Sequence, residues 1–148
     1  MNEPGRVMAL DVGGKRIGVA LCDTLRILPS PLTTIKAQPR SAAIERITTL
    51  IRQNEVAELV VGFPLTLSGE VGPQAELIKR FVADLEPSLT IPIHLFDERL
   101  TTAEAERVMI EMGLKAEQRR ARIDEMAATI ILRDYLDSRR APRHWDEE

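Results

Sequence analysis

The 148-residue sequence has few of the residues that build disulfides, zinc sites and membrane spans. Cys22 is its only cysteine, which excludes an internal disulfide and makes a small buried strand residue the expected role of Cys22. The two histidines, His94 and His144, are too few and too scattered for a zinc site. No apolar run approaches the roughly 20 residues that a membrane helix needs. These absences remove three large classes of protein from consideration.

Net charge and the N-terminus set further limits. Lys and Arg number 20 against 23 Asp and Glu, a formal charge of −3, so a positive surface for an anionic partner has to be local. The start "MNEPGR" has no apolar core behind a basic segment, which predicts a cytoplasmic protein without a secretory signal. Length and composition predict one soluble domain over residues 1–148, with a frayed charged tail from about 138.

The hydrophobic pattern predicts five strands and four helices. Strands are expected at 7–10, at 17–21, within 26–37, at 57–62 and at 93–96. Helices are expected to begin at Ser41 and Pro73, to end at Gly113 and to include 123–131. Pro29 and Pro31 place the third strand at an edge. Three antiparallel strands followed by two reached through helices predict an α/β fold with a five-stranded mixed sheet and helices packed on it.

Asp11 ends the first apolar run, in "RVMALDVGGKRIGVAL" (residues 6–21). A carboxylate at the end of an interior strand is costly unless a cation or hydrogen-bond donors receive it. One interpretation is that Asp11 accepts hydrogen bonds from the turn amides of residues 12–14. A functional role is the alternative, because chemistry in open sheets lies beyond the carboxyl ends of the parallel strands.

A second acidic pair follows the last predicted strand, in "LFDERLTTAE". Asp97 and Glu98 should emerge at the same edge of the sheet as Asp11. A salt bridge with the arginine that follows them, or a solvated loop, is the alternative. Thr101 and Glu104 have the spacing of a capping box, which accounts for Glu104 without a role in chemistry.

Asp124 lies in the first turn of the last predicted helix, in "RIDEMAATIILRDYL". Favourable interaction with the helix dipole explains an acid there without any function. Helical spacing nevertheless directs Asp124 along a largely sheet-facing stripe, whereas Glu125 points away. The other members of this stripe are Ala128, Ile131 and Tyr135. The small residues Ala127 and Ala128 would let the helix approach the sheet closely.

Acids from three distant segments are thus expected at one edge of the sheet. Carboxylates that lie within a few ångströms of each other repel, and they stay ionised only where a cation shares the site. Oxygen ligands of this kind suit one or two Mg²⁺ or Mn²⁺ ions. Such ions can activate a water and stabilise the leaving oxygen of a phosphodiester.

Four segments closely resemble the YqgF/RuvX family of pre-16S ribosomal RNA nucleases, also described as Holliday-junction-resolvase-like proteins. They are "ALDVGGKRIGVALCD", "VVGFPLTLSGEVGPQA", "DERLTT" and "DEMAATIILRDYL", and they occur in family order over residues 7 to about 137. The resemblance implies an RNase H-like fold with helices on both faces of the sheet. It also implies a catalytic set of Asp11, Asp97, Glu98 and Asp124. The resemblance leaves open which of Asp97 and Glu98 holds metal, and Glu98 is favoured because its longer side chain reaches further from the strand end. The expected metal-binding set is Asp11, Glu98 and Asp124. The family's usual Ser-Asp after the second strand is Cys22-Asp23 here.

Basic residues near these acids are the expected substrate-binding set. "LKAEQRRARI" has a local charge of +3, which suits contacts to phosphates, although a solvated face is the alternative. Aromatic residues are only 3% of the chain, so recognition should depend on the nucleic-acid backbone more than on base stacking. The expected substrate-binding residues are Lys15, Arg16, Arg99, Thr101, Lys115, Arg119, Arg120 and Arg122.

The sequence therefore favours a metal-dependent nuclease acting in 5′-end maturation of pre-16S ribosomal RNA. A resolvase of Holliday junctions or other branched DNA, and a non-catalytic nucleic-acid-binding module, are the alternatives. An ATP-binding protein of the actin and sugar-kinase type also has an Asp-x-Gly-Gly hairpin, but it needs two such domains, and no GxxxxGK[ST] motif is present. The expected partner is nucleic acid, with an RNA precursor favoured over branched DNA, no membrane is expected, and the chain is a monomer or a homodimer.

Overall fold

The computed structural model of the chain describes residues 5–64, 68–98 and 101–140, without the side chains of Thr101 and Thr102. The strands are β1 (Arg6–Val12), β2 (Arg16–Cys22), β3 (Pro29–Lys36), β4 (Val56–Phe63) and β5 (Ile93–Asp97). The helices are α1 (Arg40–Gln53), α2 (Pro73–Leu85), the short 3₁₀ helix η1 (Glu86–Ser88), α3 (Thr101–Glu111) and α4 (Ala116–Arg139). The predicted order of strands and helices is confirmed.

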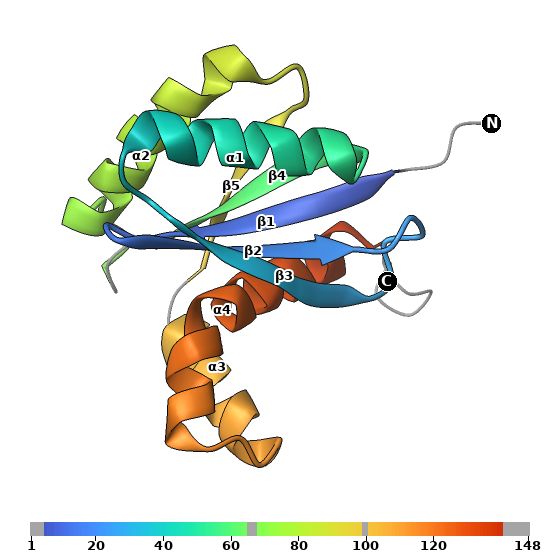
Figure 1. Cartoon of the computed structure of the whole chain (residues 1–148), viewed down its shortest axis with the longest axis vertical. Helices are drawn as coiled ribbons and strands as arrows, with labels where there is room; N and C mark the ends of the chain where they lie inside the picture. The colour runs from blue at the N-terminus through green and yellow to red at the C-terminus, as the bar shows by residue number, and fades with distance from the viewer. Residues whose placement is uncertain (1–4, 65–67, 99–100, 141–148) are drawn as a thin grey trace.

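The strands form one mixed sheet in the order β3-β2-β1-β4-β5. β1 pairs antiparallel with β2 and parallel with β4, so β1 lies at the centre of the sheet (Figure 1). β3 pairs only with β2 and forms one edge, where its Pro29 and Pro31 break no central ladder. The predicted α/β class, the mixed sheet and the edge position of the third strand are all confirmed.

Side chains alternate between the two faces of the sheet and make two hydrophobic cores. Met8 and Leu10 of β1 pack with the buried faces of α1 and α2, whereas Val7 and Ala9 pack under α4. Figure 1 shows α1 and α2 on one side of the sheet and α4 on the other. By the same alternation, Asp11 lies on the α4 face.

The last helix differs most from the sequence prediction. α4 begins at Ala116, seven residues before Ile123, because its first two turns cover no sheet and therefore show no apolar stripe. These turns pack against α3, and the two helices project together beyond the sheet (Figure 1). α4 continues to Arg139, two residues into the segment expected to form a charged tail. Within the described ranges, no helix combines the length and apolar composition needed to cross a bilayer.

Candidate metal and nucleic-acid site

Asp11 is a partly buried carboxylate at the centre of the sheet, and no described residue pairs with it. The nearby turn is closed by its own backbone, with the Gly13 N–H donating to the Arg16 carbonyl at 2.9 Å. The described part of the chain offers the Asp11 carboxylate no hydrogen bond and no ion pair, so the turn-bracing interpretation fails. Burial, together with the negative charge of Asp124, raises the pKa of Asp11 from 3.8 to about 6.

Gly18 brings Asp124 next to Asp11. Gly18 lies directly across from Asp11 in the β1–β2 register. A Cβ atom on Gly18 would overlap the backbone carbonyl of Asp124 and lie 2.8 Å from the amide nitrogen of Glu125. Only glycine at this position therefore lets α4 approach β2 so closely. The sequence reasoning missed Gly18, although a glycine inside a strand is a recognised signal of close backbone approach.

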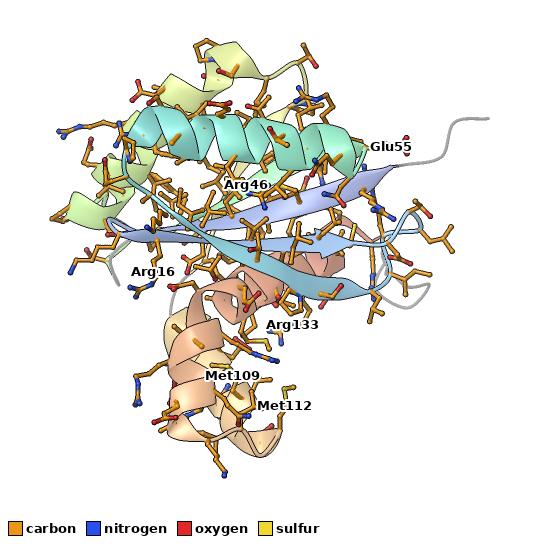
Figure 2. All side chains as sticks on the ribbon, viewed as in Figure 1. Arg16, Arg46, Glu55, Met109, Met112 and Arg133 are labelled. Atoms are coloured by element: carbon orange, nitrogen blue, oxygen red, sulfur yellow. The ribbon has the colours of Figure 1, made fainter. Side chains whose placement is uncertain are left out.

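Arg16 is the one described cation bonded to this acidic pair. Its Nε donates to Oδ2 of Asp124 at 2.7 Å. The Arg16 side chain is 58% exposed and that of Asp124 22% exposed, so the ion pair lies at the rim and not in the core. Figure 2 shows Arg16 and Arg133 on the α4 side of the sheet and Arg46 on the α1 side. The prediction that Arg16 flanks the acidic site is consistent with this placement.

The two small residues of α4 serve different contacts. Ala128 is buried against the sheet among Ala9, Ala20 and other small side chains. Ala127 instead packs with Ala105, on the side of α4 that meets α3. The expectation that both alanines bring α4 to the sheet is therefore correct for Ala128 and wrong for Ala127.

Alternation along β5 separates the two acids at its end. His94 stacks on Tyr135 of α4, with ring centroids 5.9 Å apart, and Phe96 meets the same ring edge-on at 5.7 Å. Asp97, the next residue, belongs to the opposite face and is exposed. Glu98 follows the end of β5 and lies beside Glu104 of α3 and Asp134 of α4. The two acids therefore have different surroundings, which side-chain length alone did not predict.

Glu98 lies in a second acidic group. Carboxylate oxygens of Glu98, Glu104 and Asp134 come within 4.8 Å of one another, and among the described residues no other three potential ligands do so. Arg133 supplies positive charge, with its Nη2 2.7 Å from Glu104 and 2.9 Å from Asp134. Glu104 is thus an inter-helix ion-pair partner, which the capping-box interpretation did not anticipate. Asp11 and Asp124 are brought together, whereas Glu98 turns toward α3 and the middle of α4.

The basic residues divide into paired and exposed members. Arg119 is half-buried between α3 and α4, where its Nε donates to Glu106 at 2.7 Å and its Nη1 to the Leu114 carbonyl at 2.9 Å. Arg119 therefore links the two helices, unlike a free phosphate-binding side chain. The exposed cations are Lys15, Lys115, Arg120 and Arg122. Arg99 and the side chain of Thr101, both predicted to bind substrate, lie outside the described residues.

Comparison with known proteins agrees with this arrangement. The model of the RuvX family, described as Holliday junction resolvase, matches residues 5–138. A protein of Roseiflexus sp. (strain RS-1), named "Putative pre-16S rRNA nuclease", is 64% identical over 139 residues, which are 94% of this chain and 99% of the relative. A protein of Chloroflexus aurantiacus (strain ATCC 29366 / DSM 635 / J-10-fl) with the same name is 49% identical over 135 residues, covering 91% of this chain and 88% of the relative.

Two solved structures show the same fold at low sequence identity. Thermus thermophilus RuvC, in complex with a Holliday junction substrate, is 15% identical with a TM-score of 0.57, covering 91% of this chain and 95% of its own. The fowlpox virus Holliday junction resolvase is also 15% identical, with a TM-score of 0.55 and coverage of 90% and 98%. The predicted RNase H-like fold is thereby confirmed.

Proposed function

Because the chain belongs to the RuvX family, we propose that it is a metal-dependent nuclease that hydrolyses phosphodiester bonds in a precursor of 16S ribosomal RNA. The RNA substrate is taken from the names of relatives that are 64% and 49% identical. The single observation that carries the proposal is Asp11, a partly buried acid beside Asp124 that has no donor among the described residues. The proposed substrate would be met in the cytoplasm, the compartment that the sequence predicts.

The residues at this site fit a divalent cation. Arg16 pairs with Asp124 at the rim, but the raised pKa of Asp11 indicates that this carboxylate lacks a positive partner among the described residues. Carboxylate oxygens suit Mg²⁺ or Mn²⁺, and we assign Asp11 and Asp124 as ligands. We assign Glu98 as the third ligand, which requires its side chain to turn from Glu104 and Asp134 toward Asp11 when the ion binds. When bound, such an ion activates a water and stabilises the leaving oxygen of the phosphodiester. Asp97 lies on the opposite face of β5 and is left out of the ligand set.

The chain's own residues then orient the site and the substrate. Gly18 sets the position of Asp124, and Arg16 holds the Asp124 carboxylate from the rim. The exposed cations named above surround the start of α4 and the β1–β2 turn, where they can contact phosphates without reading bases. The scarcity of aromatic residues agrees with recognition through the backbone.

Cleavage of end-labelled substrates tests the proposal. Purified protein is incubated with RNA that spans the 5′ end of 16S ribosomal RNA, in Mg²⁺, in Mn²⁺ or in excess chelator. Cleavage with an ion, none with chelator and none by the Asp11→Asn variant are expected. Cleavage that persists in chelator would contradict the metal requirement. Binding without cleavage under every condition would leave a non-catalytic nucleic-acid-binding module.

A branched-DNA substrate is the second candidate, because the family model is described as Holliday junction resolvase. A labelled four-way DNA junction is tested beside the RNA, with a linear duplex of the same sequence as the control. Faster cleavage of the junction than of both the duplex and the RNA would show that branched DNA is the substrate. The proposed metal site would be unaffected by that result.

A further inference from the structure

A groove with apolar and cationic walls lies at the end of α4 away from the acidic site. It encloses about 530 Å³ between the loop that joins β2 to β3 and the last turns of α4. Figure 1 shows this loop and the end of α4 at the same end of the sheet. Arg139 is the fifteenth residue after Asp124 in α4, which is about 22 Å along the helix. The lining residues are Leu25, Arg26, Ile27, Tyr135, Leu136, Arg139 and Arg140.

A polar network holds the two walls of the groove together. The Tyr135 hydroxyl donates to Oε1 of Glu58 at 2.9 Å. Arg26 Nη1 lies 2.7 Å from Oε2 of the same carboxylate, and Arg26 Nε donates to the Gly5 carbonyl at 2.8 Å. These contacts fix both sides of the groove before anything binds, which lowers the entropy lost on binding.

The wall formed by the loop between β2 and β3 exposes apolar side chains that nothing in the described structure covers. Leu25 is 65% exposed and Ile27 is 61% exposed. The neighbouring Leu28 is 66% exposed but does not line the groove. Adjacent exposed aliphatic side chains of this size are typical of a docking surface. The surface formed by Leu25 and Ile27 therefore favours an occupant that has an apolar side chain.

The cations at the rim of the groove favour an occupant that also carries acidic side chains. Arg139 lies over the Tyr135 ring, 5.4 Å from its centroid, and makes no ion pair with any described carboxylate. Among the described carboxylates, Arg140 pairs only with the exposed Asp137, at 3.4 Å. The groove thus suits a short segment in which a large apolar side chain precedes acidic ones. A nucleic-acid backbone supplies negative charge but nothing for Leu25 and Ile27 to cover.

The chain itself carries such a segment directly after the groove. The residues that follow Arg140 read "APRHWDEE", with Trp145 followed by three acids. Arg140 lines the groove, so this segment is tethered at its rim. Trp145 is the fifth residue after Arg140, which allows a reach of up to about 17 Å. Tethering at this range gives an effective concentration on the order of millimolar without any second molecule.

We propose that residues 141–148 dock into this groove of the same chain, with the Trp145 indole against Leu25 and Ile27 and the acids that follow it at Arg139 and Arg140. Trp and its neighbours would then cover the exposed apolar wall and pin the β2–β3 loop to the end of α4. The segment lies beyond residues 5–138, the part of the chain that the family model matches. The groove contains none of the residues assigned to the nuclease, so the proposal stands or falls independently of that activity.

Fluorescence of the full-length protein tests the docking directly, because Trp145 is the only tryptophan. Docking predicts an emission maximum to the blue of N-acetyltryptophanamide and weaker quenching by acrylamide. Both should revert toward the free amide in a Leu25→Ser, Ile27→Ser double variant. Leu28→Ser, an equally exposed leucine of the same loop, is the matched control and should leave both unchanged.

A charge variant and a dilution series complete the experiment. Arg139→Gln should increase acrylamide quenching, whereas Arg46→Gln on the exposed face of α1 should not. Emission and quenching equal to those of the free amide in the unmodified protein would overturn the proposal. A blue shift retained in the double variant would place Trp145 elsewhere. A blue shift lost on dilution would make a second copy the occupant, which also contradicts docking within one chain.

Discussion

Gly18 of β2 and the backbone of Asp124 in α4 are in direct contact, with no side chain between them. This contact sets the height of α4 above the sheet at the point where Asp11 faces the same helix. The position of the Asp124 carboxylate therefore depends on a missing methyl group 106 residues earlier in the sequence.

Gly18→Ala should lower both stability and nuclease activity. The added methyl group overlaps backbone atoms that cannot rotate away, so α4 has to shift, at a cost of about 1–3 kcal/mol. Urea unfolding and cleavage rate measure the two effects. Gly14→Ala is the control, because a Cβ there meets nothing within 4 Å, and its effect should stay within about 0.5 kcal/mol. Equal effects of the two changes would contradict the assigned contact.

Asp11→Asn and Asp124→Asn should each reduce cleavage by orders of magnitude, because each removes an anionic ligand at nearly constant volume. Asp137→Asn, on the exposed side of the same helix, should leave the cleavage rate within a few-fold. Rates are measured at saturating Mg²⁺ and again at Mn²⁺. A wild-type rate in Asp11→Asn would show that Asp11 holds no catalytic ion.

In excess chelator, Asp11→Asn should stabilise the protein in a pH-dependent way. The Asp11 pKa is about 6 in the folded chain against 3.8 normally, so the folded state binds this proton more tightly than the unfolded state does. Wild-type stability therefore falls as the pH rises from about 4 through about 6, and the loss persists above that window.

The variant has no such proton, so its advantage should be absent near pH 4 and reach about 1–3 kcal/mol above pH 6. Melting temperatures of both proteins across this range measure the difference. A variant that is less stable than the wild type at pH 7 without metal would contradict the raised pKa of Asp11.

Arg119→Ala and Arg120→Ala should have different consequences. Arg119 bridges Glu106 and the Leu114 carbonyl, so its loss should destabilise the packing of α3 on α4 by about 1 kcal/mol. Arg120 is exposed, and its loss should leave stability unchanged while flattening the salt dependence of nucleic-acid binding by about one phosphate contact. Binding titrations at several salt concentrations, with unfolding curves beside them, separate the two roles. An unchanged salt slope in Arg120→Ala would make that side chain merely solvated.

The fold was predictable where one residue pattern decides the outcome. Apolar runs located the strands, Pro29 and Pro31 marked an edge strand, and Pro73 began a helix as expected. The first two turns of α4 were missed because they pack on α3 and not on the sheet, so the pattern that marks a sheet-covering helix is absent there. Local propensity alone does not show which neighbour a polar helical segment will meet.

The sequence predicted which acids lie near the end of the sheet, but it did not predict that Glu98 would lie apart from Asp11 and Asp124. Asp11 and Asp124 were placed together by strand order and helical spacing, and the structure agrees. The association of Glu98 with Glu104 and Asp134 depends on how α3 lies against α4. That packing angle is a tertiary property, and no spacing within the "DERLTTAE" segment contains it.

The two elements that meet at Gly18, β2 and α4, are synthesised at opposite ends of the chain. The ribosome makes β1 and β2 first and α4 last among the described elements, and domains generally fold as their chain emerges. Until α4 leaves the exit tunnel, the apolar face of Val7, Ala9 and Val60 has no cover, and Asp11 has no second acid beside it. The pairing of Asp11 with Asp124 therefore forms only after α4 has been synthesised, at the end of translation of the described elements.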